Sequence, residues 1–190
     1  MNKTIFDTPI FKNIMHWSAR VFFYLTGWRA EGEKPSFRKY VLIAAPHTSN
    51  WDFVYTLLVS FILNIKIQMM GKKELVRPPF GPIVRWLGVI PIDRSKSNNT
   101  VANIVRAFDA NDDLVIVVPP SGTRKRVTYW KSGFYHIAKG ASVPIVMGYI
   151  DYRRKAGGLG PTIIPTGDIE ADMVQIRSFY SGVTGKYPER

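Results

Sequence analysis

The sequence predicts a layered α/β fold, a sheet with flanking helices, preceded by an N-terminal amphipathic helix. Short β-branched apolar runs alternate with segments whose apolar residues recur at three- and four-residue spacing, which is the pattern of strands alternating with helices. The 190 residues are 46% hydrophobic and 21% charged, an ordinary globular composition for one domain with a sizeable core. This composition excludes intrinsic disorder for the bulk of the chain.

The first element is a helix over Ile10–Trp28, where apolar residues recur at helical spacing: Phe11, Ile14, Met15, Phe22, Leu25 and Trp28. The remaining positions include Lys12, His16 and Arg20, so an aromatic apolar side faces a basic polar side. This composition is typical of a helix lying at a membrane surface, but a terminal helix packed on the core shows the same spacing.

A linker rich in Gly, Pro and charge, Glu31–Lys39, precedes the alternating elements. Strands are predicted at Tyr40–Ala45, Ile65–Met70, Val89–Ile92, Leu114–Val118 and Pro144–Ile150. Helices are predicted at Asp52–Leu63, Gly81–Leu87 and Thr100–Ala110, the last with caps from Ser97–Asn99. The glycine cluster Gly157–Pro161 predicts a turn, followed by a short strand at Thr162–Ile164 and a closing helix at Glu170–Ser181.

Charge and residue usage limit the classes of function. With 26 Lys and Arg against 14 Asp and Glu, the net charge of +12 predicts a negative partner, either nucleic acid, an anionic membrane surface or a phosphorylated molecule. The absence of cysteine excludes disulfide frameworks and thiol nucleophiles, and three histidines without a paired-His motif give no reason to expect a metal site. The longest apolar stretch, Phe53–Leu63, has 11 residues and is too short to span a membrane. The first residues lack a signal-peptide pattern, so we expect a cytoplasmic protein, peripheral to a membrane.

Residues that could carry chemistry gather in three loops, each of which follows a predicted strand, where ligand sites form in α/β sheets. In the first loop, His47 and Asp52 can meet if the chain turns after Pro46 and a helix begins with Ser49 or Asn50 as its cap. Asp52 would then bind one imidazole nitrogen and leave the other to accept a proton. For an isolated pair, the alternative is a loop histidine beside an aspartate that complements the helix dipole.

The other two loops carry cations. Gly88–Arg94 is a strand that ends in Arg94, and Val118–Arg126 offers the Gly122 backbone, the Thr123 hydroxyl and the Arg124 guanidinium to an anion. The second of these loops lacks the spacing of a Walker loop. Taken alone, Gly88–Arg94 is better explained by a surface ion pair, and the alternative for Val118–Arg126 is a solvated basic turn.

Together and in this order, the blocks resemble the glycerolipid acyltransferases of the lysophosphatidic acid acyltransferase type. His47–Asp52 matches their H-x-x-x-x-D block and Gly88–Arg94 matches the block that ends in Pro-hydrophobic-Asp-Arg. Weaker matches are Gly71–Leu75 with Pro79–Gly81, and Val143–Val146. The third block departs from the family: Pro-Glu-Gly-Thr-Arg reads Pro120-Ser121-Gly122-Thr123-Arg124 here, so that Ser121 removes a carboxylate.

The resemblance, which runs from about residue 38 to 150, implies an acyltransferase domain, which we place at 31–190; the apolar and basic pattern before it predicts an amphipathic interfacial helix at 1–30. The reaction would move a fatty acyl group from acyl-CoA or acyl-carrier protein to the hydroxyl of a lysophospholipid such as 1-acylglycerol-3-phosphate. Neither an acyl-enzyme nor a further cofactor is expected, in keeping with the missing cysteine and the lack of a nucleophile-elbow serine. The expected partners are the acceptor, the acyl donor and an anionic membrane surface, with no nucleic acid, since no reader motif is present.

Carried onto this chain, the resemblance makes His47 the general base and Asp52 the residue that orients it. The candidate substrate-binding residues are Lys72, Arg94, Ser121, Gly122, Thr123 and Arg124. Candidate walls of an acyl groove are Trp51, Phe53, Phe80 and Trp86, although each alone is more typical of a core aromatic. Two alternatives stay open: a catalytically weakened lipid-binding member of the fold, suggested by Ser121, and a basic nucleic-acid-binding module.

Overall fold

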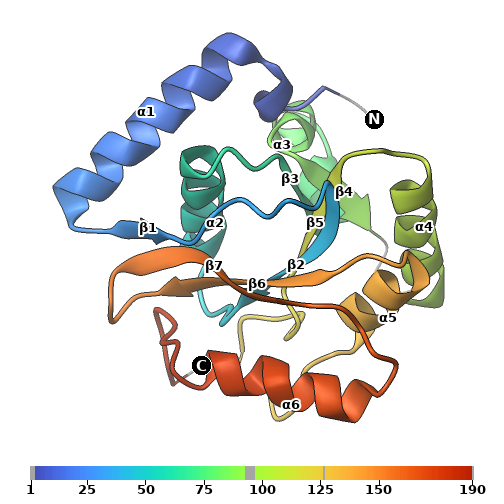
Figure 1. The fold of residues 1–190 in the computed structure, drawn as a ribbon. Helices are drawn as coiled ribbons and strands as arrows, with labels where there is room; N and C mark the ends of the chain where they lie inside the picture. The colour runs from blue at the N-terminus through green and yellow to red at the C-terminus, as the bar shows by residue number, and fades with distance from the viewer. Residues whose placement is uncertain (1–2, 93–96, 126, 190) are drawn as a thin grey trace.

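The computed structural model describes residues 3–92, 97–125 and 127–189. Its described part contains one seven-stranded sheet with the strand order β1-β7-β6-β2-β5-β3-β4 (Figure 1). The strands are β1 Arg29–Glu31, β2 Lys39–Ala45, β3 Ile67–Lys72, β4 Val89–Ile92, β5 Leu114–Val118, β6 Ile145–Asp151 and β7 Ala156–Ile163. Neighbouring strands pair in parallel except β6 and β7, which form an antiparallel pair.

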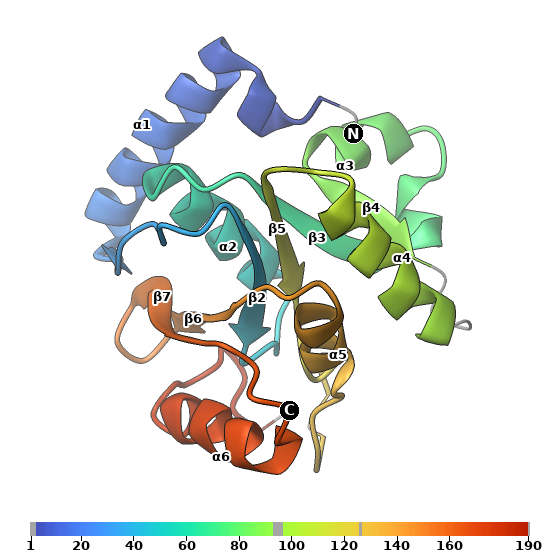
Figure 2. The same cartoon turned by 45° about the vertical axis from the view of Figure 1, so that its right-hand side comes forward.

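Helices cover both faces of this sheet. They are α1 Pro9–Thr26, α2 Trp51–Ile62, α3 Gly81–Trp86, α4 Ser97–Asp109, α5 Gly133–Gly140 and α6 Ile169–Tyr180, with short 3-10 turns η1 Ile5–Asp7 and η2 Lys73–Val76. Helices α1 and α2 lie on one face, and α4, α5 and α6 lie on the other (Figures 1 and 2). The predicted α/β fold class is therefore confirmed.

The central strands explain why these elements form one core. Successive residues of a strand point to opposite faces of the sheet, so Val41 and Ile43 of β2 pack with α5 and α6, while Tyr40 and Leu42 pack beneath α2. Every residue of β5 is buried. A parallel strand covered on both faces has no polar side, which is why these segments read as continuous apolar runs in the sequence.

The N-terminal helix is present and divides its apolar residues between core and solvent. Ala19 and Phe23 are buried against the domain, and the His16 ring lies 2.8 Å from the Phe61 carbonyl oxygen of α2. The stripe recognised in the sequence is largely exposed on the helix, with Ile14 at 54% and Leu25 at 75%, whereas Trp28, which follows the helix, is buried. Trp17, outside the stripe, is also 65% exposed. The side of α1 that packs against the domain therefore carries both polar and apolar residues, His16, Ala19 and Phe23, and much of its apolar side faces outward. Among the described residues, no helix combines the length and apolar character needed to cross a bilayer.

The predicted turn at Gly157–Pro161 is wrong, because these residues belong to strand β7. The chain turns earlier, after β6, where Lys155 has a positive φ of 48°. A Cβ on Gly158 would lie 2.0 Å from the Glu31 carbonyl oxygen of β1. The glycines therefore permit close approach of a neighbouring strand rather than a turn. The short strand predicted at Thr162–Ile164 is present as far as Ile163, but it is the end of β7 rather than a separate strand.

Other differences are smaller. Glu31, assigned to the linker, ends strand β1, which pairs with β7, and helix α5 was not predicted. Helix α4 begins at Ser97, so Ser97–Asn99 lie inside the helix rather than before it. Residues 93–96 lie outside the described part of the chain.

Candidate active site

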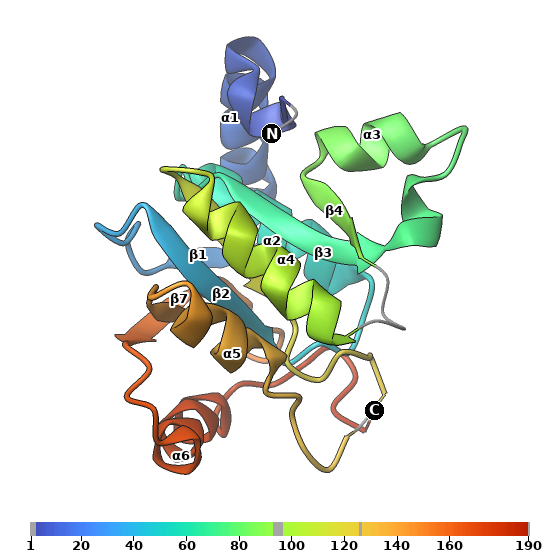
Figure 3. The ribbon, with the colours of Figure 1, turned by 90° about the vertical axis from the view of Figure 1, so that its right-hand side faces the viewer.

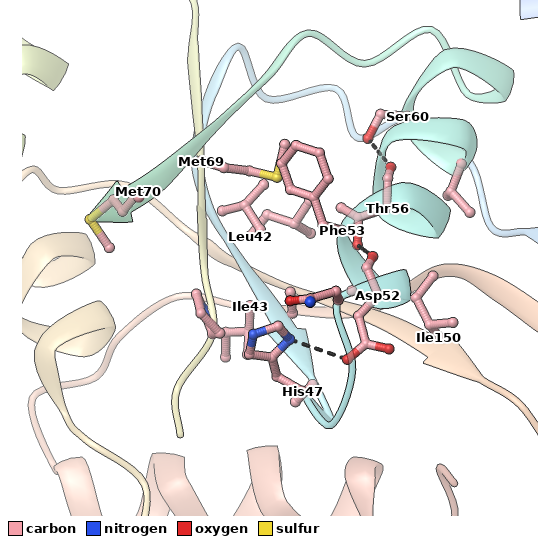
Figure 4. Close-up of a pocket in the computed structure, with 18 of the residues that line it drawn as sticks. Leu42, Ile43, His47, Asp52, Phe53, Thr56, Ser60, Met69, Met70 and Ile150 are labelled. Carbon is pink, nitrogen blue, oxygen red and sulfur yellow. Dashed lines mark hydrogen bonds and ion pairs between the residues drawn. The ribbon is translucent and has the colours of Figure 1, made fainter. Parts of the chain in front are cut away.

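His47 and Asp52 meet at the carboxyl end of β2. The strand ends at Ala45 and α2 begins at Trp51, so a short loop carries His47 while Asp52 occupies the first turn of the helix. The His47 Nδ1 and Asp52 Oδ2 atoms are 3.2 Å apart (Figure 4). The backbone N–H groups of Thr48 and Ser49 donate to the same oxygen at 2.8 and 2.9 Å. The predicted turn between the two side chains is therefore present.

The helix start differs in detail from the expected cap. Asn50 occupies the cap position without a side-chain cap bond, and the Ser49 hydroxyl accepts instead from the Trp51 N–H at 3.2 Å. Asp52 sits in the first turn, where a carboxylate complements the helix dipole. Its bonds to the preceding loop show that it also fixes the conformation of the chain around His47.

The charge of Asp52 determines which ring nitrogen of His47 faces it as a hydrogen-bond donor. Asp52 is buried, with 6% of its surface exposed. Burial acts to raise the pKa of Asp52, but the hydrogen bonds that the carboxylate accepts, first among them that from His47, bring the pKa below its ordinary value. An ionised carboxylate only accepts hydrogen bonds, so Nδ1 of His47 carries the hydrogen and a neutral ring keeps Nε2 free to accept a proton.

A further residue contacts the pair from the other side. The Tyr152 hydroxyl donates to Asp52 Oδ1 at 2.8 Å. Tyr152 directly follows β6, which is parallel to β2 and beside it, so the loops after the two strands lie together. Sequence reasoning missed Tyr152, although its place after a predicted strand matched the rule that located His47.

A cavity of about 690 Å³ extends from the pair between α2 and the sheet (Figure 4). Its lining is mostly apolar and includes Leu42, Phe53, Val59, Met69, Val117 and Ile150. Thr56 and Ser60 also line it, but their hydroxyls donate to the helix carbonyls of Asp52 and Thr56, each at 2.7 Å. The inner cavity therefore suits an apolar group.

Of the four aromatic residues proposed as walls, Phe53 alone lines this cavity. Trp51 is half exposed and lies under the Lys186 ammonium, which is 5.0 Å from its ring centroid. Phe80 is 68% exposed, and Trp86 packs edge-on against Phe11. The expectation is wrong for these three because aliphatic and methionine side chains of the strands form the walls.

The outer part of the cavity is polar and basic. Lys72 and the Gly122–Arg124 segment line it together with His47, so two of the three predicted loops, those of His47 and of Gly122–Arg124, meet at one rim. Arg124 Nη1 donates to the side-chain oxygen of Asn50, joining the third loop to the first. Lys131 lies beside Gly122, within 3.4 Å of the position that a Cβ on that glycine would take.

Two predicted substrate-binding residues stand apart. Ser121 does not line the cavity; its hydroxyl donates to the Thr123 carbonyl oxygen at 2.7 Å. Arg94 lies outside the described residues, so its role stays a prediction. Within the part of the chain that the structure describes, no group of three or more His, Asp or Glu side chains is placed to hold a metal ion.

Comparison with known proteins identifies the family. The acyltransferase family model matches residues 28–150, which include the His47–Asp52 loop, β4, the Gly122–Arg124 loop and most of β6. The chain belongs to the acyltransferase family. The relationship inferred from the order of the sequence blocks is thereby confirmed at the level of the family.

Two individual proteins are similar to this acyltransferase-family chain. The 1-acyl-sn-glycerol-3-phosphate acyltransferase of Haemophilus influenzae is 31% identical over 159 residues. The match covers 75% of this chain and 64% of the relative, so this chain spans less than two thirds of that protein's length. The crystal structure of the 1-acyl-sn-glycerophosphate acyltransferase from Thermotoga maritima matches with a TM-score of 0.60 at 16% identity, over 93% of this chain and 82% of that one, and shows a shared fold.

Proposed function

We propose that the protein transfers a fatty acyl group from a thioester to the hydroxyl of a lysophospholipid such as 1-acylglycerol-3-phosphate. The observation that carries this proposal is a His47–Asp52 pair at the junction between an apolar cavity and a basic rim. An acyl chain fits the first environment and a phosphate fits the second. The names of the two similar proteins, both acyltransferases acting on a lysophosphatidate, support the same substrate class.

The pair would act by general-base catalysis. Nε2 of His47 takes the proton of the acceptor hydroxyl as its oxygen attacks the thioester carbonyl carbon. Asp52 stabilises the imidazolium that forms and keeps the ring in one orientation. When the tetrahedral intermediate collapses, the C–S bond breaks, the ester remains on the acceptor, and the imidazolium returns its proton to the leaving thiolate. The step needs neither an acyl-enzyme nor a further cofactor.

The basic rim would bind the acceptor phosphate. Lys72, Arg124, the Thr123 hydroxyl and the Gly122 backbone are the groups we assign to it, and Arg94 and Ser121 remain candidates on the basis of the family motif. Charge-assisted hydrogen bonds from a guanidinium hold phosphate oxygens in a defined direction. The acyl donor would be acyl-CoA or acyl-carrier protein, both of which are negatively charged and would be attracted by the net charge of +12.

The lipid substrates would reach the site from an anionic membrane surface, at which we place the protein as a peripheral, cytoplasmic protein. Large apolar side chains are exposed on α1 and on the η2–α3 segment: Ile10, Ile14, Trp17, Leu25, Leu75, Phe80 and Ile83. The Phe11–Trp86 contact joins these two regions, which rise on the same side of the sheet (Figures 1 and 3). Exposed apolar area of this extent marks an interaction surface.

The direct test measures acyl transfer with labelled acyl-CoA and acyl-carrier protein against a panel of lysophospholipids. We expect turnover with at least one phosphate-bearing acceptor and its loss in His47→Ala. The exposed His136 of α5 provides the control variant His136→Ala, which should retain full activity. Full acyl transfer by folded His47→Ala would contradict the mechanism.

Ser121 supports a second candidate function, a lipid-binding protein with weakened catalysis. The carboxylate that the family motif carries at this position is absent, and the serine hydroxyl is engaged with the Thr123 carbonyl. Such a protein would bind a lysophospholipid stoichiometrically without turning over the thioester. Multiple turnovers in the acyl-transfer assay would exclude this candidate.

A further inference from the structure

The Asp52 carboxylate is held from two directions. Its Oδ2 atom accepts from His47 and from two amides of the loop between β2 and α2, at 2.8 to 3.2 Å. Its Oδ1 atom accepts from the Tyr152 hydroxyl, which comes from the distant β6–β7 connection. A carboxylate bonded through both oxygens cannot rotate about its Cβ–Cγ bond without breaking a hydrogen bond.

We propose that Tyr152 is a positioning residue, which fixes the Asp52 carboxylate in the orientation that holds His47 for proton transfer. The inference rests on the proposed function, since it concerns the same base. His47 and Tyr152 bind different oxygens of Asp52, so Tyr152 acts through that carboxylate. Without its hydroxyl, one carboxylate oxygen would lose the bond that fixes the plane of the group.

Tyr152 is itself held in place by three other segments. Its ring lies edge-on to Trp28, which follows α1, with centroids 5.3 Å apart, and edge-on to Tyr55 of α2 at 5.6 Å. Trp28 and Tyr55 stack on each other at 4.0 Å. The Tyr152 backbone N–H donates to the Thr184 carbonyl oxygen at 2.9 Å, which ties it to the C-terminal segment. Because Tyr152 is held in this way, its hydroxyl can hold the Asp52 carboxylate in one orientation.

The direction of the hydrogen bond is also settled. Burial raises the pKa of Tyr152, and the bond to Asp52 raises it further. The phenol therefore stays protonated in the range where a histidine base works, and Asp52 is the acceptor. A neutral donor at this place orients the carboxylate without cancelling the charge that stabilises the imidazolium.

The first experiment compares Tyr152→Phe with wild type. Phenylalanine keeps the ring contacts and removes the donor alone, so we expect kcat to fall roughly 10- to 100-fold, the loss of one hydrogen bond to a charged group, with KM for both substrates unchanged. The control is Tyr135→Phe, because the Tyr135 hydroxyl donates to buried Asp172 at the same 2.8 Å, between α5 and α6. This control should lower the unfolding midpoint and leave kcat intact. A wild-type kcat for folded Tyr152→Phe would overturn the proposal.

A double-mutant cycle tests whether Tyr152 acts through Asp52. In an Asp52→Ala background, Tyr152→Phe should cause no further loss of kcat, because the acceptor of its hydrogen bond is already gone. Losses that multiply as independent effects would overturn the positioning role.

A second measurement does not need turnover. Carboxyl ¹³C NMR should show a higher pKa for Asp52 in Tyr152→Phe than in wild type, because one of the bonds that lower it is removed while burial remains. An unchanged Asp52 pKa in Tyr152→Phe would contradict a hydrogen bond from Tyr152 to Asp52. If the Asp52 pKa rises in Tyr152→Phe but the wild-type protein acylates no lysolipid, the Tyr152–Asp52 hydrogen bond is supported and the proposed function fails. If the wild-type protein is active and Tyr152→Phe is equally active, only the positioning role of Tyr152 fails.

Discussion

His47 and Arg124 line the same cavity, but their substitution should change different kinetic constants, kcat for His47 and the KM of the acceptor for Arg124. His47→Ala removes proton abstraction and should lower kcat by about 10²- to 10⁴-fold, with acceptor binding nearly unchanged. Arg124→Ala removes a charge-assisted contact used equally in ground and transition states, so it should raise the KM for the acceptor. Steady-state kinetics separates the two effects. Arg177→Ala, at an exposed position of α6, is the control for loss of a positive charge. A rise in KM alone for His47→Ala would contradict this division of roles.

Ser121 is the position at which the substrate range can be tested. It precedes Gly122, which lies beside Lys131, so a carboxylate at 121 would add a negative charge to a cationic rim. Ser121→Glu restores the carboxylate of the family motif, so a gain in kcat/KM for lysophosphatidic acid would show that this chain has changed its substrate; Ser121→Ala, which adds no charge, should leave kcat/KM unchanged. The measurement compares both variants across a panel of lysolipids. No response of Ser121→Glu on any lysolipid would favour the lipid-binding alternative.

At the residue scale, what the sequence could predict depended on separation along the chain. His47 and Asp52 are five positions apart, and the strand, loop and helix between them are local features with a recognisable pattern. Tyr152 lies 100 positions from Asp52, and its contact arises only because β6 pairs with β2. Its place after a predicted strand was the one local signal, and that signal does not indicate a contact with Asp52.

At the scale of elements, buried parallel strands were predictable and close-packed glycines were not. Strands β2, β5 and β6 contain continuous apolar runs, interrupted only by Lys39 at the start of β2 and Asp151 at the end of β6, which gives them a clear pattern. Strand β7 carries three glycines where its backbone approaches β1 and neighbouring side chains, so it resembles a turn. Helix α5 was missed because its eight residues begin and end with glycine, although Phe134 and Ile137 are buried in the core.

The close approach at Gly158 can be tested through stability. A Cβ there would lie 2.0 Å from the oxygen and 2.7 Å from the carbonyl carbon of Glu31, which are backbone atoms that cannot rotate away. Gly158→Ala should therefore lower the free energy of unfolding by about 1–3 kcal/mol, the usual cost of overpacking. Gly182→Ala is the control, since nothing lies within 4 Å of its added Cβ. Equal denaturant midpoints for the two variants would show that β1 moves aside without a loss of folding stability.

At the scale of the whole molecule, the parallel sheet brings the functional loops together. The loops after β2, β5 and β6 all leave the same edge, and this places His47 and Arg124 at one opening and Tyr152 against Asp52. The sequence predicted that His47 and Arg124 lie close together, because each lies in a loop that follows a predicted strand. The cavity itself could not be predicted, because its walls combine residues from many separate strands and helices, and these residues read as ordinary core.

The arrangement of α1 against the rest of the molecule leads to a last prediction, on membrane binding. Deleting the helix would uncover the core, since Ala19 and Phe23 are buried, so exposed side chains are the proper target. Trp17→Ser with Leu25→Ser removes two side chains that are 65% and 75% exposed on the outward side of α1. Each would bury apolar area in the membrane boundary, so the double variant should bind anionic vesicles roughly 10-fold or more weakly.

The control for this variant is Val174→Ser, at an equally exposed apolar position (66%) on α6, which lies across the sheet from α1 (Figure 1). It should bind vesicles like wild type. Co-sedimentation over a salt series measures the charged contribution separately, because the attraction of a protein of charge +12 to anionic lipid weakens with salt whereas burial of apolar side chains does not. If the α1 variant binds vesicles as tightly as Val174→Ser at every salt concentration, the membrane contact lies on another surface, and the exposed η2–α3 residues Leu75, Phe80 and Ile83 become the next to substitute.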